Sequence, residues 1–274
     1  MTDYTVQTRD GFRFVDEGPT RHPFPVVLLH GMLGTYENWR STICALAGAG
    51  HRVVAPVLPV YDLPDSETSV GGLMRYTRRL TQALHIKKPI LVGNSLGGHV
   101  ALLYTLQQTD PPSALILTGA SGVDEIVLGE STPRRFDRVY VKERAALTFY
   151  DPRHASEQLV DEVMGIVADR NRVIRLIKMA RSTRRERVED ELSEIRIPTL
   201  LIWGTDDRLT PPAIAHRFQT RMSNARLELI SACGHAPMIE HPKRFNKLVL
   251  EFLGTLNQHQ PGLARPGISL PADR

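Results

Sequence analysis

The sequence of 274 residues lacks any apolar segment that is long and uncharged enough to span a bilayer. Its first ten residues also lack the apolar stretch of a secretory signal peptide. These two absences argue against a membrane-spanning or exported protein. We therefore expect a cytoplasmic protein that makes no stable membrane insertion.

Cysteine is scarce, since Cys44 and Cys233 are the only two in the chain. They lie far apart and in no spacing that is typical of a metal site or a redox pair. Neither is therefore a good candidate for a nucleophile. We expect two buried free thiols.

The balance of charge is only mildly basic, with a formal net charge of +4. The excess gathers in residues 134–138 and 181–187, and the second cluster runs into the acidic residues 189–191. Mixed charge of this kind is typical of a solvated helix, whereas nucleic-acid binding needs a larger basic surface with interleaved aromatic residues. We expect no nucleic-acid partner, while a preference for anionic substrates stays open.

What the sequence does contain is a short apolar run that leads to a serine between glycines. Residues 89–92 are apolar, residues 93–97 have the sequence Gly-Asn-Ser-Leu-Gly, and a segment of good helix formers begins at Leu96. This G-x-S-x-G pattern between a strand and a helix is typical of an exposed nucleophile on a tight turn. A serine beside glycines is also common in ordinary turns, so the pattern needs partners elsewhere in the chain.

Short apolar runs alternate with helix-like segments along most of the chain. This alternation predicts βαβ units and a parallel sheet, with ligand sites at the carboxyl ends of the strands. An Asp10-Gly11 turn predicts a hairpin at the start. The expected strands are 4–7, 12–15, 25–29, 51–58, 89–93, 114–120, 198–203 and 226–230, and the expected helices are 36–47, 70–84, 96–107, 213–220 and 242–256.

The strand pattern stops between residues 123 and 195. This region contains amphipathic, charged segments such as 157–168 and 173–180, which predict helices inserted between two strands. We interpret the region 123–195 as a helical cap, or lid, over a core formed by residues 1–122 and 196–257. The polar segment 258–274, rich in proline and glycine, is expected to be a mobile tail.

Several apolar cap residues are candidates for the wall of a substrate pocket. The same residues equally suit packing within the cap, so no substrate-binding residue is selected among them. They are Phe136, Tyr140, Phe149, Tyr150 and Met164.

A second glycine-rich loop follows the expected strand at residues 25–29. Residues 30–34 have the sequence His-Gly-Met-Leu-Gly, in which the glycines let the backbone approach a ligand closely. The backbone amide of Met32 would then be free to donate to that ligand. An ordinary strand-to-helix loop is the alternative interpretation.

Two further polar groups follow expected strands at the same edge. Asp207 follows the strand at 198–203, and His235 follows the strand at 226–230. A serine hydroxyl needs an imidazole to take its proton, and the imidazole needs a carboxylate to orient it. The order Ser95, Asp207, His235 is the order expected of an α/β-hydrolase.

Residues 4–256 resemble the α/β-hydrolase family. The resemblance depends on the segments 30–34, 93–98, 203–208 and 234–242. It implies an α/β fold with a mostly parallel eight-stranded sheet, flanked by helices, and a helical cap inserted after the sixth strand. It also implies that Ser95 is the nucleophile, Asp207 the orienting acid and His235 the general base, with an oxyanion hole formed by the amides of Met32 and Leu96. No metal ion or organic cofactor is implied.

Other acids and histidines lie near these positions. Asp206 is one residue away from the position of the family's acid, so we expect it to make local hydrogen bonds. Asp124 follows the preceding strand, where some family members keep their acid, and is a minor alternative. His30 and His241 are expected to be structural, and His99 to be a packing residue.

The resemblance implies a serine hydrolase that acts on a small molecule, and a carboxylic ester is the expected substrate. One alternative is a hydrolase that cleaves carbon–carbon bonds in meta-cleavage products, since residues 94 and 95 and the cap resemble that branch. The chain departs from the branch at Ala236, where a tryptophan is usual, and in residues 161–166, which lack the usual cap arginine. A ligand-binding or signalling member with little turnover is the other alternative.

Overall fold

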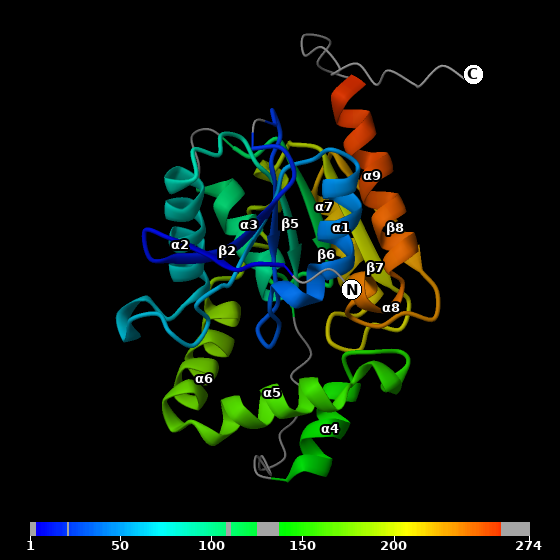
Figure 1. Ribbon diagram of the computed structural model, residues 1–274. Coiled ribbons are helices and arrows are strands. Elements are labelled where there is room, and N and C mark those ends of the chain that lie inside the picture. The colour runs from blue at the N-terminus through cyan, green and yellow to red at the C-terminus, as the bar shows by residue number, and fades with distance from the viewer. Residues whose placement is uncertain (1–3, 21, 108–110, 125–136, 259–274) are drawn as a thin grey trace, which may run out of the picture.

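The computed structural model describes residues 4–20, 22–107, 111–124 and 137–258. Their centre is an eight-stranded sheet of order β1-β2-β4-β3-β5-β6-β7-β8 (Figure 1). The pairs from β3 onwards are parallel, and β2 pairs antiparallel with both β1 and β4. The strands are Gln7–Arg9 (β1), Phe12–Glu17 (β2), Val26–Leu29 (β3), Val53–Pro56 (β4), Ile90–Asn94 (β5), Ala114–Thr118 (β6), Thr199–Gly204 (β7) and Ala225–Ile230 (β8).

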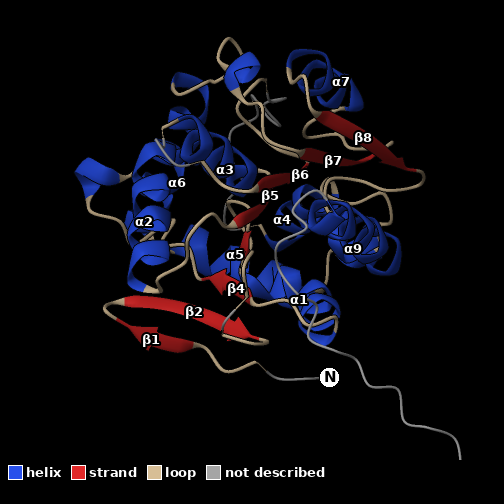
Figure 2. Cartoon of the chain, turned by 90° about the horizontal axis from the view of Figure 1, so that it is seen from above, coloured by secondary structure: helices blue, strands red, loops and turns tan. Residues whose placement is uncertain are grey.

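The central strands consist of continuous apolar runs because helices cover both faces of the sheet. In Figure 2, α1 (Arg40–Gly48) and α9 (Pro242–Gln258) lie on one face. The opposite face is covered by α2 (Val70–Ala83) and α3 (Leu96–Leu106), with α7 (Pro212–Arg221) beside β8. Two separate apolar cores result, one on each face.

The N-terminal hairpin forms at the predicted turn, with positive φ angles of 51° at Asp10 and 78° at Gly11. Its first strand lies later in the chain than expected. Gln7 pairs with Phe14 and Arg9 with Phe12, because the residues that flank a two-residue turn must pair directly. The strand therefore continues to Arg9 and occupies the edge of the sheet.

Between β6 and β7, the regular secondary structure of the described residues is entirely helical. It comprises α4 (Arg138–Ala146), η3 (Pro152–His154), α5 (Glu157–Ala168), α6 (Arg170–Arg185) and η4 (Leu192–Glu194). Figure 1 shows α4 and α5 beyond one end of the sheet. The division into core and cap stays a prediction. The expected tail after residue 258 and the candidate pocket residue Phe136 lie outside the described residues.

Three short helices complete the chain. They are η1 (Tyr36–Trp39), η2 (Asp65–Glu67) and α8 (Pro237–Glu240). Within the ranges given above, no helix is long and apolar enough to cross a membrane.

The expectation of two buried thiols is correct for one cysteine only. Cys233 is buried, whereas Cys44 is exposed. The helix α1 buries Thr42, Ile43 and Leu46. Its period of 3.6 residues turns position 44 outward, so the expectation for Cys44 is wrong.

Candidate active site

Ser95 occupies a strained turn between β5 and α3. Its backbone has φ 54° and ψ −119°, a region that costs a residue with a side chain about 1–3 kcal/mol. Small neighbours make the turn possible, since a Cβ atom on Gly97 would lie 2.1 Å from the Leu29 carbonyl oxygen and one on Gly93 would lie 2.4 Å from the Gly97 oxygen. The sequence pattern around Ser95 therefore has a steric cause.

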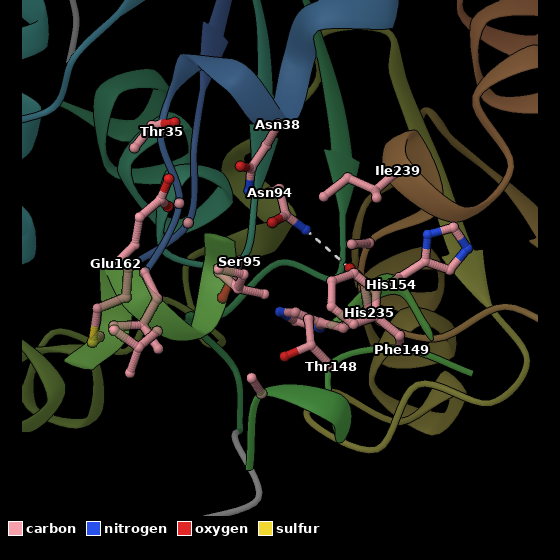
Figure 3. Close-up of a pocket in the computed structure, with 18 of the residues that line it drawn as sticks. Thr35, Asn38, Asn94, Ser95, Thr148, Phe149, His154, Glu162, His235 and Ile239 are labelled. Atoms are coloured by element: carbon pink, nitrogen blue, oxygen red, sulfur yellow. Dashed lines mark hydrogen bonds between the residues drawn. The ribbon is translucent and has the colours of Figure 1, made fainter. Parts of the chain in front are cut away.

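Ser95 borders a cavity of about 350 Å³, which is also lined by residues of α4 and α5. This volume is within the range of small-molecule sites. Figure 3 shows His235 on the side of the cavity next to Ser95, with its imidazole directed toward the serine. Other walls of the cavity are formed by Met32, Phe149, Leu159 and Glu162.

Asp207 and His235 form a buried pair. The Asp207 Oδ2 atom lies 2.9 Å from the His235 Nδ1 atom, and both side chains have relative exposures of 5% or less. The Asn94 amide holds the His235 backbone, because its Nδ2 group donates to the His235 carbonyl at 3.1 Å (Figure 3). The histidine loop is thereby fixed to the residue that precedes Ser95.

The Asp207 carboxylate accepts several hydrogen bonds besides the one from His235. The Leu209 and Thr210 amides donate to Oδ1, and the Thr210 hydroxyl donates to Oδ2, each at 2.9 Å. Burial raises the pKa of Asp207, but the His235 ring and the bonds from His235 and Thr210 outweigh burial and leave the pKa below its ordinary value. The carboxylate is thus stabilised in its charged form next to the imidazole.

The loop after β3 contributes Met32 to the wall of the cavity. The Gly34 amide donates to the Gly31 carbonyl at 3.1 Å, which makes Met32 a central residue of the turn. The Tyr61 hydroxyl donates to the Met32 carbonyl at 2.6 Å and fixes the Met32–Leu33 peptide, which directly follows the Met32 amide. Leu96 is the first residue of α3, where helix amides have no intrahelical acceptor. Met32 lines the same cavity as Ser95, and Leu96 follows Ser95 directly, so both amides are candidates for oxyanion donors.

The competing acids have other contacts. Asp206 accepts a hydrogen bond from the Thr205 hydroxyl at 2.6 Å, which agrees with the expected local role. Asp124 forms ion pairs with Arg187 and Arg217. Neither aspartate is among the residues that line the cavity.

The competing histidines bind backbone groups. His30 donates from Nδ1 to the Gly31 carbonyl at 2.8 Å and accepts at Nε2 from the Leu58 amide at 3.0 Å. Burial lowers the pKa of His30 to about 4, although the bond to Gly31 opposes this shift. His99 is buried and donates to the Glu186 carbonyl at 2.7 Å, and His241 donates to the Ala232 carbonyl at 2.9 Å. These contacts are those of structural residues.

Sequence reasoning gave no role to Thr210, Tyr61 or Glu240. Glu240 joins the histidine loop to the cap, because its Oε1 accepts from the Gly234 amide and its Oε2 from the Tyr150 amide, both at 2.7 Å. The Glu240-His241-Pro242 segment is part of the family pattern, and this pattern was the feature of the sequence that could have identified Glu240. Thr210 and Tyr61 carry no pattern that identifies their partners.

Ser95 and His235 line the same cavity, and Asp207 contacts the His235 imidazole. A carbonyl group placed beside Ser95 would have the imidazole as proton acceptor and the amides of Met32 and Leu96 as donors to its oxygen. No group of three or more histidine, cysteine, aspartate or glutamate side chains suited to a metal ion occurs in the described ranges.

Comparisons with known proteins identify the class. A model of the alpha/beta hydrolase family matches residues 26–248. The chain is 31% identical to an alpha/beta hydrolase enzyme from the sediment metagenome of the Mar Chica lagoon, Morocco, with a TM-score of 0.75 over 92% of this chain and 98% of that one. The chain therefore belongs to the alpha/beta hydrolase family, as expected, and this membership supports a hydrolase.

Two similar proteins are more specific. A 2-hydroxy-6-oxononadienedioate/2-hydroxy-6-oxononatrienedioate hydrolase from Burkholderia vietnamiensis is 29% identical over 248 residues, which are 83% of this chain and 86% of that protein. The structure of a meta-cleavage product hydrolase from Pseudomonas fluorescens is 25% identical, with a TM-score of 0.76 over 90% of this chain and 96% of that one.

These similarities contradict the expected carboxylic ester substrate and favour the carbon–carbon bond alternative. The reason is chemical, since a serine, histidine and aspartate with an oxyanion hole attack the carbonyl of an ester or of a ketone alike. The leaving group, which distinguishes the two, is selected by the pocket. The departures at Ala236 and in residues 161–166 do not outweigh similarity over 83% of the chain.

Proposed function

We propose that this protein is a serine hydrolase that breaks a carbon–carbon bond beside a ketone in a small molecule of the meta-cleavage type. The observation that carries the proposal is the similarity to the Burkholderia vietnamiensis hydrolase over most of both chains. The cavity of about 350 Å³ beside Ser95 supports it, because its volume suits a dienoate of this kind.

The proposed roles follow from the contacts around the cavity. Ser95 is the nucleophile, and His235 takes its proton. Asp207 orients the imidazole through the 2.9 Å contact with Nδ1 and stabilises its charged form. The amides of Met32 and Leu96 donate to the oxyanion.

The reaction proceeds in two halves. Ser95 Oγ attacks the ketone carbon, and the oxygen of the resulting tetrahedral intermediate accepts from the two amides. In the 2-oxo tautomer of the substrate the carbon–carbon bond then breaks, its electron pair is delocalised onto the 2-oxo group as a dienolate, and His235 returns the proton to that fragment. Water activated by His235 hydrolyses the acyl group from Ser95 and releases a carboxylic acid. Each step uses side chains and amides of this chain, so the proposal includes no metal ion or cofactor.

A chromogenic meta-cleavage dienoate with an uncharged substituent on its ketone tests the proposal. We expect the wild type to consume it, and Ser95→Ala to lower kcat by roughly 10⁴-fold or more. Ser113→Ala is the matched control, because the Ser113 hydroxyl donates to the Lys88 carbonyl on the surface. Rapid hydrolysis of simple p-nitrophenyl esters with no consumption of the dienoate would contradict the proposal.

The expected cytoplasmic location stays a prediction.

A further inference from the structure

The cavity beside Ser95 has an acidic side chain in its wall. Glu162 extends from α5, and Figure 3 shows it on the opposite side of Ser95 from His154. The Gln158 amide donates to the Glu162 Oε1 atom at 3.1 Å. This bond comes from a neutral group, so it leaves the negative charge of the carboxylate uncompensated.

Glu37, the other acidic residue of the wall, differs in this respect. Its Oε2 atom lies 2.7 Å from Nη2 of Arg40, and this ion pair compensates its charge. Among the residues that the structure describes, no lysine or arginine pairs with Glu162, and none lines the cavity. A bound anion thus meets a net negative wall at Glu162.

Apolar side chains also line the cavity. Leu159 and Val163 lie on the same helix as Glu162, and Met32 and Leu33 belong to the loop after β3. Apolar side chains favour the burial of an uncharged group, and they add to the cost of desolvating a carboxylate that gains no partner there.

We infer that Glu162 is a specificity-determining residue that excludes substrates with a carboxylate on both arms. The inference rests on the proposed function. A meta-cleavage dienoate has one arm with a carboxylate and one arm that bears the ketone substituent. When the substituent also carries a carboxylate, whichever arm lies along α5 meets Glu162. A monocarboxylate can direct its uncharged arm there, so the preferred substrate class is a dienoate with an alkyl or aryl substituent.

This specificity differs from that of the similar proteins whose names specify dienedioates. Glu162 is exposed to solvent, so its repulsion of a second carboxylate is screened, but at a separation of a few ångström it still opposes binding by about 1 kcal/mol or more. The discrimination is therefore expected in binding as well as in turnover.

Binding to protein that carries Ser95→Ala tests the inference without turnover. The probes are a 2-hydroxy-6-oxo dienoate with a methyl or phenyl substituent and the corresponding dienedioate, measured by calorimetry. We expect the monocarboxylate to bind at least about tenfold more tightly, and Glu162→Gln to reduce this preference to about threefold or less. Asp161→Asn is the matched control, since Asp161 lies next in sequence on α5 but outside the cavity wall. It should leave the preference unchanged.

Equal or tighter binding of the dienedioate would overturn the inference, as would a preference that Glu162→Gln does not change or a failure of both probes to bind. Turnover of the monocarboxylate by the wild type, measured separately, decides the proposed function. Binding with the expected preference but without turnover would sink the proposed function and leave the role of Glu162 in ligand selection supported.

Discussion

The Thr210 hydroxyl donates at 2.9 Å to the Asp207 Oδ2 atom, the same oxygen that lies 2.9 Å from His235 Nδ1. Thr210 thereby acts as a positioning residue for the acid and the imidazole together. Thr210→Val keeps the shape of the side chain and removes the hydroxyl. We expect kcat on the dienoate to fall about tenfold with KM within about twofold, because a hydrogen bond to a charged group contributes about 1.5–3 kcal/mol.

Thr205→Val is the control for this prediction. The Thr205 hydroxyl makes the equivalent bond to Asp206, one residue before Asp207. The Thr205→Val substitution should leave kcat unchanged. Equal effects of the two variants would show that the hydroxyl of Thr210 has no special relation to the site.

The choice between the neighbouring acids gives a second prediction. Asp207→Asn should lower kcat by roughly 10³–10⁴-fold, because an amide does not stabilise a charged imidazole. Asp206→Asn should retain most of the activity, since Asp206 contacts Thr205 and not the histidine. Steady-state kinetics of both variants decides which aspartate orients the histidine. A larger loss of kcat in Asp206→Asn than in Asp207→Asn would show that the acid is wrongly identified.

Tyr61 gives a third prediction, because its hydroxyl holds the Met32 carbonyl at 2.6 Å. Tyr61→Phe frees the Met32–Leu33 peptide, and the Met32 amide belongs to the peptide directly before it. We expect kcat to fall about tenfold, since an unmade hydrogen bond of this kind costs about 1–3 kcal/mol. Tyr76→Phe, at a buried tyrosine of α2 away from the cavity, is the control. An unchanged kcat in Tyr61→Phe would argue against a role of the Met32 amide.

Stability should depend on pH through the buried histidines. Burial lowers the pKa of His99 from 6.5 to about 4, although the Glu186 carbonyl opposes the shift. In the window between these values the unfolded chain binds a proton at His99 and the folded protein does not, so the free energy of unfolding falls as the pH falls. At pH 5 the loss due to His99 is about 2 kcal/mol relative to neutral pH.

Urea unfolding of the wild type and of His99→Gln at about pH 7.5 and pH 5 measures this term. His30 and His51 have pKa values lowered in the same direction, so both proteins should lose stability in acid. The variant should lose about 2 kcal/mol less. The same loss in both proteins would contradict the buried neutral state of His99.

Much of the fold was predictable, because its determinants are local. The helix predicted at residues 157–168 has the bounds of α5, whose start is marked by the Ser156 side chain that accepts from the Leu159 amide. Strands such as β5, β6 and β7 lie at their apolar runs. The helices α4 and α8 were not predicted, since the apolar residues of α4 are not confined to one face of the helix and α8 has only four residues in all. The helix α6 is longer than expected because charged residues on its outer face continue it.

The candidate site was predictable in part, for the same reason. Ser95 and His235 follow strands whose ends meet at one edge of a parallel sheet. The contacts of Tyr61 with Met32 and of Glu240 with Tyr150 join segments that are far apart in the chain, and tertiary packing alone creates them. The bond that is cleaved was predicted wrongly, because the side chains that attack a carbonyl do not define what leaves it.

The most direct test of the account is a count of the products from a monocarboxylate dienoate. The wild type should release one carboxylic acid from the ketone side and one shorter dienoate-derived fragment for each molecule consumed, and Ser95→Ala should release neither at a comparable rate. Isomerisation of the dienoate without release of the acid, or equal release by Ser95→Ala, would contradict carbon–carbon bond hydrolysis by Ser95.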